Sequence, residues 1–395
     1  MNGKKKIFVF YTLEFLMITI AILYSFQNFS IINGGDGMNQ FFPAFVYCGK
    51  YIREILQGIL HGKFYLTQYD FCIGMGDGII PALNGYGVGD PFILLSSLVP
   101  VKYAAYAYTA VILIKMYVSG WGFIYYCKKR CIKETAALGG TAFYLANNYV
   151  FNMCFMFPSF LSVQISLPFL CSGIDEVIRN QESRKKISFS MILAVAYQAL
   201  YGFYFLYVEL LFAAIYALVQ LICKYKSFKT FLSEIGILFV HIVTGIMIAG
   251  MFFIPAVLEY FSSSRGGDFV WLGWKVLLRL ELSEYWGAFS SLIAPGSSMG
   301  VGLMIPSISI FLIYVAFKGK GNYKELKILG VILAFAYVEM RFTSYIAGGF
   351  TADIYYNRWI FCFMFLIAVM TSLGIEKMRN ISDRLFIFGG GVSPS

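Results

Sequence analysis

Long apolar runs recur through most of this 395-residue sequence, and they constrain its fold more than any other feature. A helix crosses a bilayer with roughly 20 predominantly apolar residues. Ten runs near this length lie at 7–32, 103–127, 136–152, 159–178, 187–203, 204–223, 232–257, 301–318, 328–347 and 357–375. Only 13% of the residues are charged, against about 25% in soluble domains. The sequence therefore predicts an all-α polytopic membrane protein with one transmembrane domain, 1–384, and a tail, 385–395.

Basic residues predict the orientation of these spans. With ten spans both termini lie on one side, and most of the 31 Lys and Arg then fall on that side, in clusters near 4–6, 128–133, 179–186, 224–229, 318–327 and 377–384. Because cytoplasmic loops retain Lys and Arg, we expect a cytoplasmic N-terminus and an extracytoplasmic loop 33–102. This bias also explains the net charge of +10. No nucleic-acid-binding signature accompanies it, so no nucleic-acid partner is expected.

Cysteine and histidine patterns exclude several kinds of chemistry. The eight cysteines include no CxxC pair and no dense cluster, so neither a zinc site nor a disulfide framework is predicted. The two histidines are His61 and His241, and the second lies in an apolar run. The favoured interpretation of His241 is a buried imidazole whose nitrogens have hydrogen-bond partners. Histidine-based catalysis is therefore not favoured.

The loop 33–102 is the one long, polar, acid-bearing segment of the chain. Asp36 lies between two glycines, and Asp70 and Asp90 also lie in glycine-containing stretches. Glycines let the backbone approach a ligand closely, and carboxylates accept protons or hold metal ions. The three aspartates are therefore candidate site residues, although Gly and Asp also mark ordinary turns.

Part of this loop has the pattern of an amphipathic helix. Apolar residues recur there at steps of four and three, with charged residues opposite: Phe41, Phe45, Cys48, Ile52, Ile55 and Ile59. Pro43 suits the start of the helix, and Asn39 or Asp36 suits its cap. The predicted helix lies in the membrane surface beside the active face; a helix that only covers the bundle is the alternative.

Three cations are expected near the outer membrane surface. Lys275 and Arg279 are four residues apart on one helical face, and Arg358 lies at the start of the last span. Cations at this depth could hold a lipid phosphate. A solvated basic face is the alternative.

Charges within the expected spans include Glu14, Lys115, Glu209 and Glu339, with Arg341 close to Glu339. A charge in hydrocarbon is costly, so each is expected to face the bundle interior and find a partner. We expect Lys115 to form a structural ion pair with Glu14 or Glu209.

The order and spacing of several motifs resemble the YfhO family of bacterial multi-spanning membrane proteins. The motifs are Gly35-Asp36-Gly37, Gln40, Phe42-Pro43, Asp70-Phe71 with Gly74 and Gly76, and Gly89-Asp90-Pro91-Phe92. The similarity extends from the first span to the last, and only the first outer loop carries distinctive motifs. That family looks like a branch of the GT-C glycosyltransferases.

The resemblance implies an enzyme of the bacterial cytoplasmic membrane. Such an enzyme, surrounded by membrane lipid, takes a sugar from a polyprenyl-phosphate donor and attaches it outside the membrane to a cell-wall polymer such as lipoteichoic acid. The resemblance implies that the catalytic acidic residue of the first outer loop is Asp36. The expected substrate-binding residues are Gln40, Asp70, Asp90, Lys275, Arg279 and Arg358. A requirement for a divalent metal stays open, and because family members are usually longer, with a large outer domain, we expect this chain to be a fragment or a truncated product.

Chemistry favours a transferase with a single carboxylate. A phosphate leaving group departs without being protonated, so one base suffices, whereas glycoside hydrolysis typically uses two carboxylates. Two alternatives stay open. One is a transporter or flippase of a lipid-linked sugar, with Lys115 and Glu209 as its working residues, and the other is a non-catalytic scaffold for envelope enzymes.

Overall fold

The computed structural model describes residues 3–25, 30–32, 34–179, 187–224, 227–262, 270–278, 282–292, 303–319, 323–351 and 357–389. Regular structure in these ranges is helical apart from one short antiparallel hairpin. In it β1 (Tyr69–Asp70) pairs with β2 (Asp77–Gly78), with Tyr69 opposite Gly78 and Asp70 opposite Asp77. The expected all-α polytopic fold is confirmed.

The bundle and its covering elements are built from helices of very different lengths. The larger ones are α1 (Gly3–Ser25), α2 (Phe42–Leu60), α5 (Ala104–Lys129), α6 (Glu134–Leu145), α7 (Leu161–Arg179), α8 (Phe189–Tyr201), α9 (Phe203–Lys224), α10 (Phe228–Ile248), α11 (Gly250–Ser262), α13 (Leu282–Ser290), α14 (Ser307–Lys318), α15 (Lys324–Val338), α16 (Met340–Ala347) and α17 (Ile360–Gly389). Short elements are α3 (Ile79–Leu83), α4 (Leu94–Ser97), α12 (Trp274–Leu277), η1 (Gly37–Phe41), η2 (Asn84–Tyr86), η3 (Pro91–Ile93), η4 (Val101–Tyr103), η5 (Val150–Cys154) and η6 (Pro158–Phe160).

Six helical segments of the described chain are long and apolar enough to cross a membrane. They are Lys5–Ser25, Val101–Lys129, Pro158–Arg179, Phe203–Lys224, Phe228–Ile248 and Ile360–Met378. The described chain also has three shorter apolar helices, Phe189–Tyr201, Gly250–Ser262 and Ser307–Lys318. Helix α17 continues to Gly389, so residues 385–389 of the expected tail are helical.

Two of the expected spans are interrupted. The run 232–257 contains the end of α10 and the start of α11, and the run 328–347 is divided at Glu339 between α15 and α16. At the second break the hydroxyl of Thr343 donates to the carbonyls of Ala336 and Glu339, at 2.8 and 3.1 Å. A side-chain hydroxyl thus satisfies carbonyls at a helix break, as an apolar environment requires.

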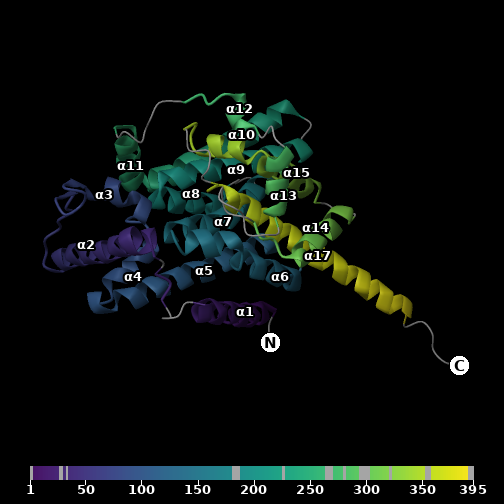
Figure 1. Ribbon diagram of the computed structural model, residues 1–395, viewed down its shortest axis with the longest axis horizontal. Helices are drawn as coiled ribbons and strands as arrows, with labels where there is room; N and C mark the ends of the chain where they lie inside the picture. Colours follow the sequence, from purple (N-terminus) through teal and green to yellow (C-terminus); the bar gives the residue numbers. More distant parts are fainter. Residues whose placement is uncertain are drawn as a thin grey trace.

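The core lies where α7 contacts α5, α8 and α9, and where α17 contacts α6 and α14 (Figure 1). Helices approach closely at glycines, where no side chain keeps the backbones apart. An added Cβ at Gly140 of α6 would overlap the hydroxyl of Ser372 on α17, and one at Gly173 of α7 would lie 2.5 Å from Met191 Cβ on α8. The first contact joins the C-terminal helix α17 to α6, and the second joins α7 to α8.

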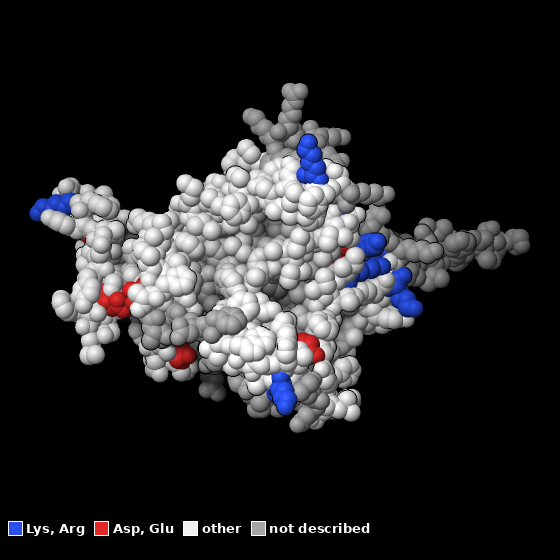
Figure 2. Space-filling view, turned by 90° about the horizontal axis from the view of Figure 1, so that it is seen from above, with Lys and Arg blue, Asp and Glu red and all other residues white. Residues whose placement is uncertain are grey.

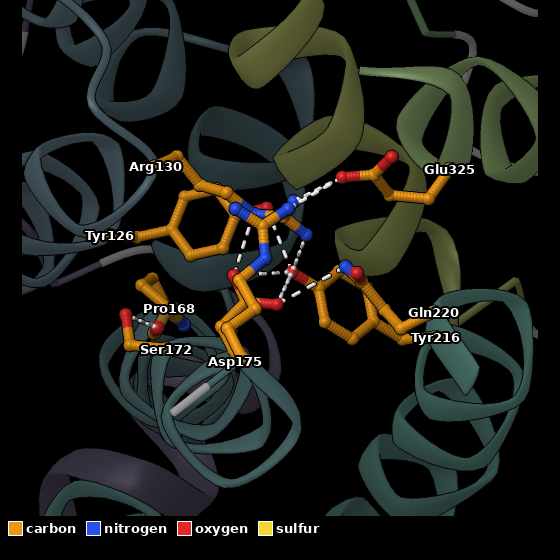
Figure 3. A network of polar contacts seen from close by, with 9 residues as sticks. Tyr126, Arg130, Pro168, Ser172, Asp175, Tyr216, Gln220 and Glu325 are labelled. Atoms are coloured by element: carbon orange, nitrogen blue, oxygen red, sulfur yellow. Dashed lines mark hydrogen bonds and ion pairs between the residues drawn. The ribbon is translucent and has the colours of Figure 1, made fainter. Parts of the chain in front are cut away.

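A buried polar network ties α5, α7, α9 and α15 together (Figure 3). The Arg130 side chain, directly after α5, is fully buried. Its Nε lies 2.6 Å from Asp175 Oδ2, its Nη1 lies 2.7 Å from Glu325 Oε1, and its Nη2 donates to the Tyr216 hydroxyl at 2.5 Å. Glu325 Oε1 also lies 2.6 Å from Arg179 Nη2. Arg130, which the sequence grouped with loop cations, is therefore a buried link between helices.

The face shown in Figure 2 is mostly uncharged. The Lys and Arg side chains in this view gather most closely near one end of the molecule, at the right, and Asp and Glu form small separate groups. Many large apolar side chains on α10 and α11 are exposed, among them Phe239, Met247 and Ile254. Such a surface suits contact with hydrocarbon, because charged groups are costly there.

Candidate functional site

Helix α2 attaches the polar loop to the bundle. The apolar side of its first half is buried against α4 and α5. Arg53 donates from Nε to the Ser97 carbonyl at 3.0 Å and from Nη2 to the Val99 carbonyl at 2.8 Å. These carbonyls lie at and just beyond the end of α4, where helical partners are lacking. The predicted amphipathic helix is present, its first half contacts protein, and Ile59 and Leu60 at its far end are exposed.

Asp36 occupies the position before η1, yet its side chain makes no capping hydrogen bond. Its Oδ1 instead accepts from Gln40 Nε2 at 2.7 Å, and Gln40 Oε1 accepts from the Tyr86 hydroxyl at 2.8 Å. Among the residues that the structure describes, Asp36 Oδ2 has no hydrogen-bond partner. A Cβ added to Gly34 or Gly35 would meet no atom within 4 Å. One carboxylate oxygen is therefore held in place, and the backbone before it borders open space.

Asp90 uses both carboxylate oxygens within the protein. Oδ1 accepts from the Phe92 backbone N–H at 3.0 Å and caps η3, while Oδ2 lies 2.7 Å from Lys115 Nζ. Both side chains of the ion pair are almost completely buried. The Lys115 ammonium also lies 4.6 Å from the centroid of the Tyr201 ring. Asp90 thus shapes its turn and joins the loop to the middle of α5.

This ion pair corrects one expectation. Lys115 pairs with Asp90 rather than with Glu14 or Glu209. The reason is that the loop folds back onto the bundle and brings its own carboxylate to α5, a contact that hydropathy within the spans does not reveal.

A small pocket of about 40 Å³ lies beside the ion pair. Loop segments and helices α2, α5 and α8 line it with Phe41, Phe45, Tyr86, Asp90, Ile93, Tyr108, Val111, Ile112, Lys115, Pro158, Ser159 and Tyr201. Tyr86 belongs both to this lining and to the hydrogen-bonded chain that reaches Asp36 through Gln40. Tyr86 therefore links the pocket lining to the Asp36 carboxylate through Gln40.

Asp70 holds the hairpin against α2. Its Oδ2 accepts from the Tyr47 hydroxyl at 2.6 Å, and its Oδ1 accepts from the Cys72 backbone N–H at 2.8 Å. The hydrogen bond from Tyr47, followed by that from Cys72, lowers the pKa of the Asp70 carboxyl below its ordinary value. The contacts of Asp70 are with α2 and its own turn.

Arg358 lies at the far end of an aromatic row that begins at the polar site. The ring centroids of Tyr86 and Phe41 are 5.0 Å apart, those of Phe41 and Phe157 are 5.7 Å apart, and those of Phe157 and Phe160 are 5.1 Å apart. The guanidinium carbon of Arg358 lies 5.8 Å from the Phe160 centroid. The aromatic row thus connects a guanidinium from the last span to the loop that carries Asp36.

The other two predicted cations are placed differently. Lys275 is exposed on the short helix α12, which packs against α16. Arg279 lies outside the described residues.

Sequence reasoning missed Tyr86, Tyr47 and Lys115 as neighbours of the predicted acids. The four-residue spacing of Asp36 and Gln40 is a local signal for their contact. Tyr86 is 46 residues from Gln40, and Lys115 is 25 residues from Asp90. No short-range pattern indicates contacts at such separations.

Within the described ranges, no group of three or more His, Cys, Asp and Glu side chains lies close enough together to hold a metal ion. Asp36 has Gln40 and Tyr86, rather than further carboxylates, in its hydrogen-bonded chain. Among the described residues, the side chains around Asp36 therefore do not provide the ligand set of a metal site.

Fold and site together define a polytopic helical membrane protein whose first polar loop is folded onto the bundle and presents the partly free carboxylate of Asp36. The chain belongs to the YfhO family, because the family model described as bacterial membrane protein YfhO matches residues 10–391. The resemblance found in the loop motifs is thereby confirmed over nearly the whole chain. Comparisons with curated proteins and with solved structures gave no match.

Proposed function

We propose that this protein is a GT-C-type glycosyltransferase that moves a sugar from a polyprenyl-phosphate carrier to a cell-wall polymer such as lipoteichoic acid. The observation that carries the proposal is the hydrogen bonding of the Asp36 carboxylate. Its side chain does not cap a helix, one of its oxygens is oriented by Gln40, and the other has no partner in the described residues. A carboxylate held in this way is suited to accept a proton from a substrate.

The proposed reaction requires one base. The acceptor hydroxyl oxygen attacks the anomeric carbon of the sugar, the bond from that carbon to the carrier phosphate oxygen breaks, and the hydroxyl proton passes to Asp36 Oδ2. The phosphate leaves with the bonding electron pair and needs no proton, because it is a weak base. Asp36 then releases the proton to water, which the open space beside Gly34 and Gly35 admits.

Arg358 is the best-placed cation for the carrier phosphate. It lies at the end of the aromatic row that leads from the polar site. Guanidinium binds phosphate with two parallel hydrogen bonds, which a lysine cannot do. Lys275, on exposed α12, is a secondary candidate.

The transporter interpretation relies on Lys115 and Glu209 as working charges within the spans. The Lys115 ammonium is already paired with Asp90 and lies over the Tyr201 ring. Moving it would leave two buried charges without compensation, which is strongly unfavourable. This contact supports a structural role for Lys115 and favours the transferase.

The proposal requires the loop 33–102 to lie outside a bacterial cytoplasmic membrane and the N-terminus inside, as the basic residues predict. Membrane-impermeant thiol reagents added to intact cells should therefore label cysteines introduced at 62–70 and not at 182–186. Labelling of the second group alone would reverse the topology and remove the site from the side where polymer acceptors lie.

The decisive experiment replaces Asp36 with Asn in membrane-reconstituted protein supplied with radiolabelled polyprenyl-phosphate sugar. Asn keeps the side-chain shape and can still accept from Gln40, but it is not a base. We expect transfer to fall on the order of 10²-fold with unchanged thermal stability. Glu54→Gln removes an exposed carboxylate of α2 and serves as the matched control. Transfer at the parental rate by Asp36→Asn would end the catalytic assignment.

A further inference from the structure

The pocket beside Lys115 has a composition that selects among ligands. Its walls are largely aromatic and aliphatic, and its polar groups come from Asp90, Lys115, Ser159 and several tyrosines. Such pockets combine apolar contact with a few oriented polar groups that determine specificity.

Charge balance in the pocket disfavours an anion. The Lys115 ammonium and the Asp90 carboxylate are 2.7 Å apart and neutralise each other. A phosphate entering here would face the Asp90 carboxylate and would have to draw Lys115 away from it, leaving a buried charge unpaired. The pocket is therefore suited to a neutral ligand.

One polar group of the lining has no partner. The Tyr108 side chain is buried, and its hydroxyl makes no hydrogen bond within the part of the chain that the structure describes. Its ring is fixed by edge-to-face contacts with Phe42 and Phe45, at centroid distances of 5.6 and 5.3 Å. A buried hydroxyl left unpaired is unfavourable, so a ligand that bonds to it gains affinity.

The size of the pocket limits what enters it. A volume of about 40 Å³ holds only a few water-sized groups. It accommodates one or two hydroxyl groups with their carbons, and the rest of a sugar ring would lie outside it.

We propose that this pocket binds the hydroxyl-bearing edge of a neutral sugar or polyol unit, with the Tyr108 hydroxyl and the Asp90 carboxylate as its recognition groups. A hydroxyl group both donates and accepts, and it can therefore bond to Tyr108 and to Asp90 without disturbing the ion pair. This inference rests on the proposed function: the pocket binds the carbohydrate part of a substrate, and the carrier phosphate binds outside the pocket.

The test measures direct binding to the full chain in lipid nanodiscs by saturation-transfer difference NMR. The probes are methyl β-D-glucopyranoside, methyl β-D-galactopyranoside and sorbitol, with inorganic phosphate as a competitor. Tyr108→Phe removes the hydroxyl and keeps the ring, and Tyr106→Phe makes the same change at an exposed position of the same helix. Ser159→Ala is a second lining variant.

We expect at least one neutral probe to bind, and Tyr108→Phe to raise its Kd about five- to tenfold, the scale of one lost hydrogen bond. Tyr106→Phe should leave the Kd unchanged, and phosphate should not displace the probe. Absence of binding by all three probes, displacement by phosphate, or an unchanged Kd in both Tyr108→Phe and Ser159→Ala would overturn the proposal.

These outcomes are separate from those of the proposed function. Asp36→Asn does not alter the lining and should bind the neutral probe as the parent does. If Asp36→Asn transfers sugar normally while Tyr108→Phe loses the probe, the transferase assignment fails and the binding pocket stands. If Asp36→Asn abolishes transfer while Tyr108→Phe binds the probe normally, the transferase assignment stands and the proposed binding pocket fails.

Discussion

The ammonium nitrogen of Lys115 lies 2.7 Å from Oδ2 of Asp90, and the two side chains expose only 3% and 6% of their surfaces. Lys115 belongs to the middle of α5, and Asp90 belongs to the turn before η3. The polar loop is therefore attached to the bundle by a buried ion pair as well as by the apolar face of α2.

Lys115→Met should destabilise the protein by about 3–5 kcal/mol, because it leaves the Asp90 carboxylate buried without a cation. The double variant Lys115→Met with Asp90→Asn removes both charges and should recover most of that loss. Thermal melting in detergent measures both. Equal loss in the single and double variants would show that the charge pair itself does not determine the stability.

Arg358→Ala should weaken use of the lipid-linked donor on the order of tenfold or more, the scale of hydrogen bonds to a charged group. Lys275→Ala should change it only slightly, since a pairing at an exposed side chain contributes about 0–1 kcal/mol. Donor KM in the reconstituted transfer assay distinguishes the two variants. An unchanged donor KM in Arg358→Ala would remove Arg358 from the phosphate site.

The hairpin at Asp70 should loosen in acid. Because hydrogen bonds from Tyr47 and Cys72 lower the pKa of Asp70 in the folded state, its carboxylate stabilises the hairpin above the ordinary value of 3.8. This contribution falls as the pH drops below that value and through the lowered pKa. The hydrogen-exchange protection factors of residues 69–78 should fall over this pH range in the parent. In Tyr47→Phe the fall should be smaller, because the folded-state pKa of Asp70 is lowered less. An acid response that is identical in Tyr47→Phe would contradict this role of the hydroxyl.

Arg130→Lys should destabilise the bundle strongly, since a single ammonium cannot reproduce the fork that reaches Asp175, Glu325 and Tyr216. Loss of a buried partner is expected to cost about 3–5 kcal/mol. Lys128→Met, at an exposed position of the same helix end, is the control and should be nearly neutral. Unfolding in detergent with rising SDS measures the stability of both variants. Equal stability of the two would show that the Arg130 network does not contribute strongly to the stability of the bundle.

The helical fold could be predicted because backbone polar groups in hydrocarbon must be hydrogen-bonded within the protein, and a helix meets this requirement. The long apolar runs mark the segments to which it applies. The helix break at Glu339 could not be predicted from the sequence. It depends on the Thr343 hydroxyl, which donates to the carbonyls of Ala336 and Glu339. At the candidate site, closely spaced motifs predict Asp36 and Gln40, and the structure shows that their side chains are hydrogen-bonded. Their connection to Tyr86, and the pairing of Asp90 with Lys115, arise from tertiary folding of the loop onto α5. Arg130 shows the same limit, because a basic cluster beside a span does not reveal which member turns inward.

The network around Arg130 also bears on how the chain is made. Arg130 and Asp175 are synthesised early, whereas Glu325 follows 195 residues after Arg130. Until the ribosome delivers Glu325, the guanidinium has only one of its two carboxylates, and the surface that receives α15 stays open. Completion of this charge cluster therefore requires that the late helix α15 has packed against the early helices α5 and α7.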